Sequence, residues 1–362
     1  MESQTLIEKI IDNARWAPSG DNMQTWRFEI INDQHFVVHG YDTREHCVYD
    51  LQGHASQLAI GALLESINIS ASAFQYLTEF KLRSDLPETK PTIDVFLSYD
   101  SSVMSDPLLP FLPIRSVQRR MMKSTQLTVE QKMALEQAVG NFYSIKWIEG
   151  FANRCRAAWL MQQNGKLRLT LPEAFSTHST VIEWNARFSD DKIPDQAVGL
   201  DPLATKSMKW AMQSWKRVSF LNSYCFGTLL PRIELDLLPG LFCAAHFAIV
   251  AERKPESVED YLNVGRAVQR FWLTATQLGM QLQPEMTPLI FFGYVKEKVL
   301  FSRNVQLTDY TEKLSNVFEL LIGKSIIYRA VFVGRIGQGD IAKARSLRHS
   351  VRKLISFDDI NN

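Results

Sequence analysis

A cluster of polar side chains suited to binding a flat ligand follows the first helical segment. Pro18 and Gly20 interrupt that helix, and a glycine lets the backbone approach a ligand closely. Ser19, Asn22 and Gln24 carry hydroxyl and amide groups, which both donate and accept hydrogen bonds. This loop can therefore match a planar molecule with donors and acceptors along its edge. The alternative is an ordinary polar loop between a helix and a strand.

A second group of candidate residues is basic. Arg115 and Arg119 lie in the stretch 114–123, and Arg345 and Arg348 lie near the C-terminus. The planar guanidinium group can donate two parallel hydrogen bonds to one phosphate. These arginines could therefore bind a phosphate, and the alternative is a solvated basic face.

The sequence lacks the motifs of several other chemistries. It contains no P-loop, no GxSxG and no HExxH, and no GxGxxG follows a predicted strand. The glycine-rich stretch 334–339 is interpreted as a turn, and His246, inside an apolar run, as a hydrogen-bonded core residue. No CxxC pair occurs and no histidine has metal-ligand spacing, so we expect no metal site and four buried free thiols: Cys47, Cys155, Cys225 and Cys243.

Composition is that of a soluble globular protein. The chain has 362 residues, of which 46% are hydrophobic and 22% are charged, and its formal net charge is +1. This balance predicts neither a nucleic-acid partner nor a membrane partner. The longest apolar stretch, 237–250, is too short to cross a bilayer, and no secretory signal is recognised at the N-terminus. We therefore expect a cytoplasmic protein.

Apolar periodicity divides the chain into helices and strands. The proline-containing stretch 100–113 is expected to be a linker. The helices 55–75 and 257–278 have Gly, Ala and apolar residues at the same mutual spacing, which is a faint internal repeat. Helices are predicted over 4–16, 55–75, 128–139, 151–163 and 257–278, and strands over 25–31, 36–40, 93–99, 144–148, 241–251 and 326–336.

Residues 14–28, ARWAPSGDNMQTWRF, resemble the signature of the FMN-dependent nitroreductase family. In that signature a helix end is followed by Ala-Pro-Ser-Gly, an Asn, a Gln, Pro-Trp and a strand. Thr25 departs from it, because the family usually has Pro there. The resemblance implies that the flavin is contacted by Pro18, Ser19, Gly20, Asn22 and Gln24.

The family's arginine-rich motif for the FMN phosphate is similar to residues 113–121. Arg115 and Arg119 take its outer positions, whereas Val117 replaces a Ser or Thr and Met121 replaces a Phe. The resemblance further implies that two C-terminal arginines, Arg345 and Arg348, close on the same phosphate.

A third segment, the turn after the long helix 257–278, is also implicated by the resemblance. The family lays this turn against the reactive face of the flavin, which implies cofactor contacts from Gln283, Pro284 and Glu285. Glu285 considered alone is equally compatible with a surface carboxylate. No catalytic acid or base is identified.

The order of these pieces suggests a duplicated chain. Nitroreductases hold FMN across a dimer interface, and here the loop precedes the arginines within one polypeptide. The resemblance is to the duplicated, Acg-like branch and implies an α+β fold, with mostly antiparallel sheet flanked by helices. Two fused halves, 1–112 and 113–362, would form a pseudo-dimer with one FMN. Lid insertions are expected at about 166–222 and 286–323.

The expected function is that of an FMN-dependent oxidoreductase. Hydride would pass through flavin N5 to or from a small organic substrate, with NADPH or NADH as the electron donor. The alternative is a flavin-storing protein without turnover, in which Trp184, Trp210 and Trp215 of the lid cover the flavin. We expect a monomeric pseudo-dimer or a homodimer.

Overall fold

The computed structural model describes residues 4–224 and 227–355, which contain two four-stranded antiparallel sheets. The first sheet has the strand order β1-β2-β4-β3. One face of it is covered by two helices, α1 (Leu6–Ala14) and α2 (His54–Ser72), whose apolar side chains share one core with the strands. The strands are β1 (Trp26–Asn32), β2 (His35–Gly40), β3 (Tyr76–Leu82) and β4 (Thr92–Tyr99).

The second sheet has the order β10-β11-β9-β5 and is covered on both faces. Helix α10 (Val258–Gln277) packs on one face, and α4 (Phe151–Thr170), α11 (Thr287–Glu297) and α12 (Val305–Ile322) pack on the other. Because both faces are covered, every residue of β9 is buried. The strands are β5 (Tyr143–Ile148), β9 (Ala245–Ala251), β10 (Met280–Pro284) and β11 (Ala330–Gln338).

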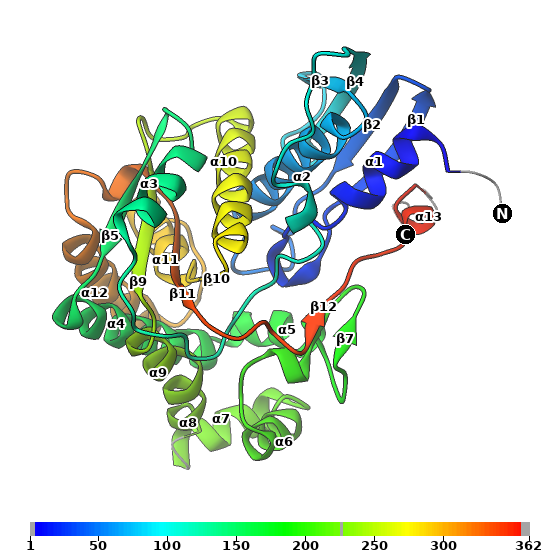
Figure 1. The fold of residues 1–362 in the computed structure, drawn as a ribbon. Coiled ribbons are helices and arrows are strands. Elements are labelled where there is room, and N and C mark those ends of the chain that lie inside the picture. Colours follow the sequence, from blue (N-terminus) through cyan, green and yellow to red (C-terminus); the bar gives the residue numbers. More distant parts are fainter. Residues whose placement is uncertain (1–3, 225–226, 356–362) are drawn as a thin grey trace.

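The long helices α2 and α10 lie side by side between the two sheets (Figure 1). A Cβ added to Gly61 would lie 2.0 Å from the carbonyl oxygen of Leu262, and one added to Gly265 would lie 2.1 Å from that of Leu58. The two backbones therefore approach as closely as they do because both positions are glycine.

The predicted α+β class is confirmed, since both four-stranded sheets are antiparallel and carry helices. Most predicted elements occur, including α3 (Val129–Ala138), which begins at its predicted N-cap Thr128. The prediction missed β3, which pairs with β4 along its length, and ended α4 too early. The stretch 100–113 contains only a short 3-10 turn, Leu109–Phe111.

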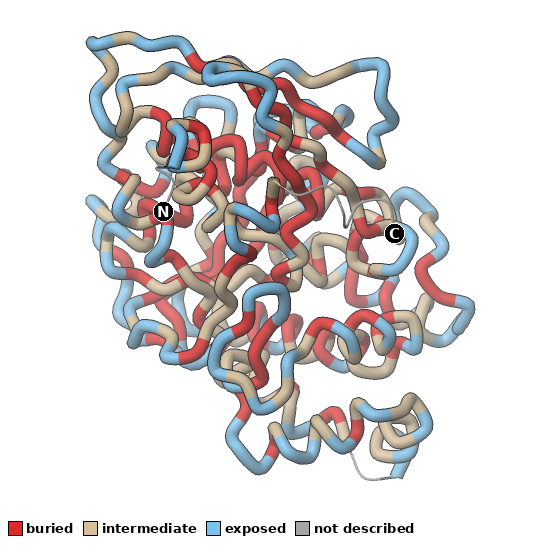
Figure 2. Tube along the Cα trace, turned by 90° about the vertical axis from the view of Figure 1, so that its right-hand side faces the viewer, coloured by how far each residue is buried: buried red, intermediate tan, exposed pale blue. Residues whose placement is uncertain are grey.

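The two segments expected to be lids differ in their packing. Residues 286–323 form α11 and α12, whose Phe292 and Phe318 belong to the core beneath the second sheet. Part of the segment 166–222 lies at the lower end of Figure 1, where Figure 2 shows mostly intermediate and exposed residues. The segment contains three short helices. They are α5 (Pro172–Val181), α6 (Pro202–Ala211) and α7 (Trp215–Tyr224), followed by α8 (Leu229–Arg232) and α9 (Leu238–Leu241).

The C-terminal segment returns to the first sheet. Helix α13 (Val351–Ile355) packs on β1 and α1, and its Leu354 is buried in the N-terminal core. The preceding short strand β12 (Arg345–Ser346) pairs with β7 (Phe188–Ser189), while β6 (Ile182–Glu183) pairs with β8 (Ile193–Pro194). The segment 345–349 consequently passes beside the loop that follows α1.

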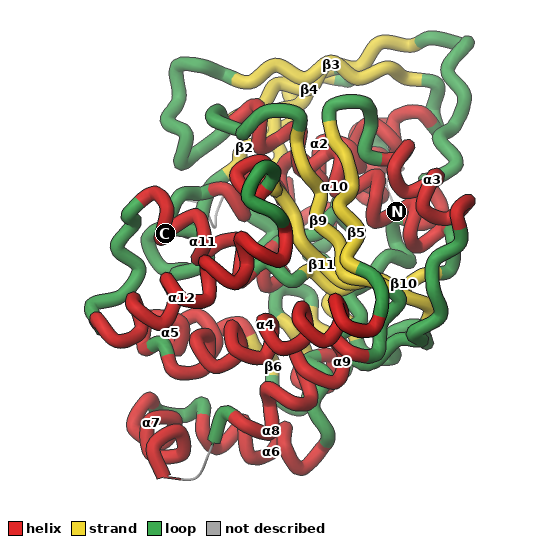
Figure 3. The backbone as a smooth tube through the Cα atoms, turned by 90° about the vertical axis from the view of Figure 1, so that its left-hand side faces the viewer, coloured by secondary structure: helices red, strands yellow, loops and turns green. Residues whose placement is uncertain are grey.

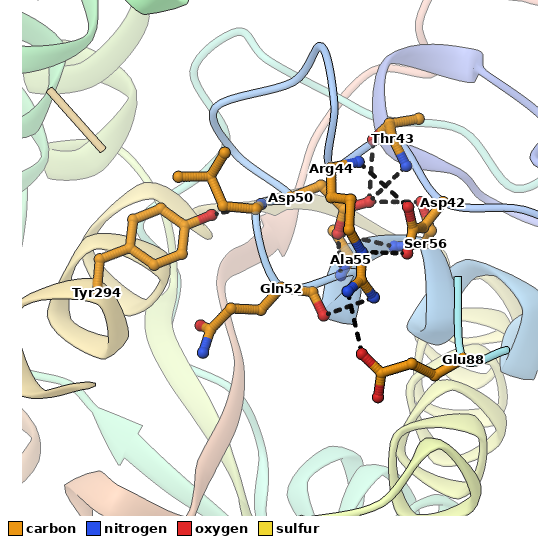
Figure 4. A network of polar contacts seen from close by, with 10 residues as sticks. Asp42, Thr43, Arg44, Asp50, Gln52, Ala55, Ser56, Glu88 and Tyr294 are labelled. Atoms are coloured by element: carbon orange, nitrogen blue, oxygen red, sulfur yellow. Dashed lines mark hydrogen bonds and ion pairs between the residues drawn. The ribbon is translucent and has the colours of Figure 1, made fainter. Parts of the chain in front are cut away.

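A buried carboxylate fixes the entry of the chain into α2 (Figure 4). Asp50 accepts hydrogen bonds from Ala55 N at 2.8 Å and from Ser56 Oγ at 2.6 Å, close to the positive end of the helix. Across the network, the Tyr294 hydroxyl donates to Val48 O at 3.0 Å and accepts from Leu51 N at 2.9 Å. Helix α11 thus holds the segment that precedes α2.

No helix in the described part of the chain is both apolar enough and long enough to span a bilayer.

Candidate functional site

The loop after α1 has an unusual backbone. Asp21, Asn22 and Gln24 all have positive φ, at 48°, 65° and 48°. Left-handed backbone is unfavourable for residues with a Cβ, and such strain gathers at ligand sites. The conformational freedom expected of Gly20 is used instead by these three residues, and a Cβ at Gly20 would meet nothing within 4 Å. Pro18 and Ser19 are half-buried beside it.

Hydrogen bonds hold this strained loop in place. Ser19 Oγ accepts from Gln24 N at 3.0 Å. The buried Gln24 amide donates to Asp190 O at 2.8 Å and accepts from His349 N at 2.9 Å. Asn22 Nδ2 also donates to Asp190 O, at 3.2 Å. The insertion and the C-terminal segment therefore clamp the loop from two sides.

We expect Asp21→Gly to be more stable to unfolding than Asp21→Ala by about 1 kcal/mol, because only glycine relieves the left-handed strain. Both changes remove the same carboxylate, so their difference isolates the backbone. Urea unfolding followed by circular dichroism measures it, and equal midpoints for the two variants would contradict strain at this position.

Three arginines gather around the start of this loop. Arg115 Nη2 donates to Trp16 O at 2.9 Å, and Arg348 donates to Ala17 O through Nε at 3.0 Å and Nη2 at 2.9 Å. The Arg345 guanidinium lies 5.1 Å from the centre of the Trp16 ring. Residues far apart in the sequence are thus brought together, as predicted for Arg115, Arg345 and Arg348.

This arginine trio lacks negative partners. Among the described residues, none of the three forms an ion pair with a carboxylate, and the Nε atoms of Arg115 and Arg345 are buried without a hydrogen-bond partner. Burial lowers the pKa of Arg115, and the nearby charges of Arg348 and Arg345 lower it further. Burial, with Arg345 and Arg15, likewise lowers the pKa of Arg348 to about 9. Buried cations without a counter-charge favour an anionic ligand.

Arg119 lies apart from the trio and lines a cavity of about 500 Å³. Its Nη1 donates to Ala197 O at 3.2 Å, and burial lowers its pKa to about 10, against the opposing effect of Asp21. The volume is that of a typical small-molecule site. The wall is mainly aliphatic and thioether, contains none of Trp184, Trp210 and Trp215, and has as its charged members Asp21, Arg119, Arg168, Asp236, Glu285 and Arg335.

The segment predicted as a turn after α10 is largely strand β10 (Met280–Pro284), and its end forms one wall of the same cavity. Gln283, Pro284 and Glu285 all line it, and Gln283 Oε1 is buried without a partner. Glu285 is 7% exposed, so the surface alternative for this carboxylate is wrong. Its two oxygens contact His246 Nδ1 at 2.7 Å and Arg335 Nη1 at 2.8 Å.

The His246–Glu285–Arg335 group is an internal ionic network. Burial lowers the pKa of His246, but Glu285 and Cys243 raise it by more, so the net pKa is raised. Burial raises the pKa of Glu285, and its two cationic neighbours reverse this, so the net pKa is lowered. His246 Nε2 lies 2.9 Å from Gly240 O, which confirms it as a hydrogen-bonded core residue. Glu285 is consequently held in place and is not a free base.

Sequence reasoning missed several polar cavity residues. Asp21 lies inside the recognised loop. Arg168 and His178 of the insertion, and Asp236 after it, have no spacing that marks them. His178 Nε2 lies 3.0 Å from the Tyr49 hydroxyl, and burial with Arg168 lowers the pKa of His178 to about 3. A neutral imidazole and phenol therefore join the insertion to the segment before α2.

The cysteines are less buried than predicted. Cys243 is buried, but Cys47 and Cys155 are partly exposed, and Cys225 lies outside the described residues. Burial raises the pKa of Cys47 to about 11, so its thiol is not activated. No cluster of potential metal ligands occurs within residues 4–224 and 227–355.

The comparisons with known proteins bear on the N-terminal part of the chain. Residues 3–73 match the model of the Nitroreductase family. This part of the chain is nitroreductase-like. The match covers α1, the strained loop, the β1–β2 hairpin and α2, so it confirms the resemblance inferred from residues 14–28. The arginine trio and the segment 283–285 lie outside it.

One similar solved structure is the crystal structure of a nitroreductase-like family protein from Bacillus cereus. The two are 11% identical, and the similarity covers 70% of this chain and 97% of that chain with a TM-score of 0.35. No curated protein matches the chain.

Proposed function

We propose that this chain is an FMN-dependent oxidoreductase of the nitroreductase type. The observation that carries the proposal is that the strained loop joins two features, a cavity on one side and an arginine trio bound to the backbone just before it. The strained loop contributes Asp21 to the cavity, the end of β10 contributes Gln283, and the arginine trio binds the carbonyls of Trp16 and Ala17 just before the loop. Such an arrangement suits an elongated ligand with an anionic end and a planar polar end.

The phosphate end of FMN fits the arginine trio, Arg115, Arg345 and Arg348. Two of these side chains are almost fully buried, they repel one another, and two Nε donors have no acceptor. A phosphate would supply both the missing acceptors and the missing charge. Arg119 is assigned instead to the ring end, because it faces the cavity beside Asp21.

The ring end fits the cavity between Asp21 of the loop and the segment 283–285 at the end of β10. In the cavity wall, Gln283 Oε1 is a buried acceptor without a donor, which an N–H or hydroxyl group of a flavin would satisfy. Bound FMN would supply hydride chemistry through its N5 atom, with NADPH or NADH as the donor. The positive charge of Arg119 in the wall favours a ligand that gains negative charge on reduction.

We also propose that the chain arose by duplication, with halves 1–112 and 113–362. Support comes from the strand orders β1-β2-β4-β3 and β5-β9-β11-β10, which correspond position by position. The helix contacts correspond too. Gly61 meets Leu262 as Gly265 meets Leu58, and the pair Ser66–Gln269 repeats the placement of Glu65–Arg270. A single chain would then supply both sides of the site.

One FMN per chain is proposed because the second half lacks an equivalent loop. The turn between α3 and β5 holds Gly140, whose φ is 78°, and an exposed Phe142. It has one amide side chain, Asn141, in place of the Asn22 and Gln24 pair, and it has no non-glycine left-handed residue like those of the loop at 19–24.

The test is titration of the purified full-length protein with FMN, followed by anaerobic addition of NADPH. We expect saturation near one FMN per chain and bleaching of the flavin absorbance within seconds. Stable binding without bleaching by NADPH or NADH would favour the storage alternative, for which the clamp of the insertion on Asn22 and Gln24 is the structural support. Absence of FMN binding would contradict both functions.

A further inference from the structure

The helices α6 to α8 form a basic segment within a nearly neutral chain. Residues 202–233 contain no Asp or Glu, whereas the formal charge of the whole chain is +1. Its basic residues are Lys206, Lys209, Lys216, Arg217 and Arg232, the last of which is buried against α4. The expectation of no membrane partner was based on the net charge of the whole chain, and that value does not show that basic residues are concentrated in one segment.

Helix α6 has two distinct faces. Ala204, Met208 and Ala211 line the cavity, with spacings of four and three residues that place them on one side. Leu203, Lys206 and Trp210 share another side, at spacings of three and four, and all three are exposed. Leu203 is 74% exposed and Trp210 is 47% exposed, which is unusual for such apolar side chains.

Helix α7 repeats this arrangement. Val218 and Leu221 line the cavity, whereas Lys216, Phe220 and Tyr224 lie four residues apart on an exposed face. The Arg217 guanidinium lies 4.8 Å from the centre of the Trp210 ring and links the two helices. Leu229 at the start of α8 is 45% exposed, does not line the cavity and adds further apolar surface.

Figures 1 and 3, which differ by a 90° rotation, both place α6, α7 and α8 at one end of the molecule, away from the two four-stranded sheets. Their outer surface combines lysines with exposed tryptophan, tyrosine, phenylalanine and leucine. Aromatic side chains of this kind suit a lipid–water interface, and lysines suit anionic headgroups.

We propose that the outer faces of α6 and α7, with the start of α8, dock on an anionic lipid bilayer. The lysines attract the headgroups, and the exposed apolar side chains enter the boundary between headgroups and acyl chains. The opposite faces of the same helices line the cavity, so docking would place the cavity directly behind the membrane contact. A lipophilic substrate would then have a short route from the bilayer. This inference does not require that the cavity holds FMN.

The test is sedimentation of the full-length protein with vesicles. We expect binding to vesicles of phosphatidylcholine mixed with phosphatidylglycerol, little binding to phosphatidylcholine alone, and weakening by salt. The triple variant Lys206→Gln, Lys209→Gln and Lys216→Gln should lose affinity on the order of a hundredfold, at about fivefold for each charge. Trp210→Ala combined with Phe220→Ala should weaken binding without abolishing its salt dependence.

A matched control removes three exposed lysines at the other end of the molecule: Lys9→Gln, Lys81→Gln and Lys90→Gln should retain native binding. Equal loss in this control, or no binding of the native protein to anionic vesicles, would overturn the proposal. Self-association abolished by the Trp210 and Phe220 changes would overturn it as well, in favour of a second copy of the chain. The FMN content of each variant, measured separately, distinguishes these outcomes from failure of the proposed oxidoreductase function.

Discussion

Replacing Gly61 with alanine is expected to lower the free energy of unfolding by about 3 kcal/mol. The added Cβ would lie 2.0 Å from the carbonyl oxygen of Leu262, and neither partner can move as a flexible side chain would. The helices α2 and α10 must therefore move apart. This weakens the contacts between the two helices, which lie between the two sheets. Gly265→Ala should behave alike, because its Cβ would lie 2.1 Å from Leu58 O.

The matched control is Gly293→Ala in helix α11. A Cβ at Gly293 meets nothing within 4 Å, so helix propensity alone should stabilise the protein by about 0.5–1 kcal/mol. Urea or thermal unfolding compares the variants. If Gly61→Ala and Gly293→Ala had the same stability, the close approach of the two helices would be wrong, and with it the strongest support for a pseudo-dimer.

Local chemistry explains how much of the fold could be predicted. The capping residues Thr128 and Ser257 marked two helix starts, because each accepts from the backbone three residues later. Strand β3 was missed because its alternating side chains are only half-buried at the sheet edge, so the apolar signal is weak.

The candidate site also has features that could be predicted from the sequence and features that could not. The strained loop was recognisable because its residues are contiguous, whereas the contacts that hold it join Gln24 to Asp190 and His349 across the fold. No local spacing encodes such contacts. Arg115 and Arg119 looked like one motif, yet the chain directs Arg115 to the trio and Arg119 to the cavity. Sequence proximity alone therefore did not decide which ligand atoms each arginine would face.

Replacing Arg115 and Arg348 together with alanine should weaken FMN binding by about a hundredfold to ten-thousandfold. Each change removes charge-assisted hydrogen bonds to the phosphate, worth about 1.5–3 kcal/mol apiece. Flavin fluorescence measures the affinity in a direct titration. Arg253→Ala is the matched control, since that side chain is 76% exposed and pairs with Asp260 in the first turn of α10.

The same double variant tests whether the arginine trio binds an anionic ligand or stabilises the folded protein. Without ligand, its buried charges repel one another and lack carboxylate partners, so their removal should leave the melting temperature of the apo-protein little changed or raised. FMN should raise the melting temperature of the native protein by mass action and should fail to do so in the variant. A large loss of apo-protein stability, with FMN affinity intact, would assign Arg115 and Arg348 to holding the carbonyls of Trp16 and Ala17. The phosphate would then have to be bound elsewhere.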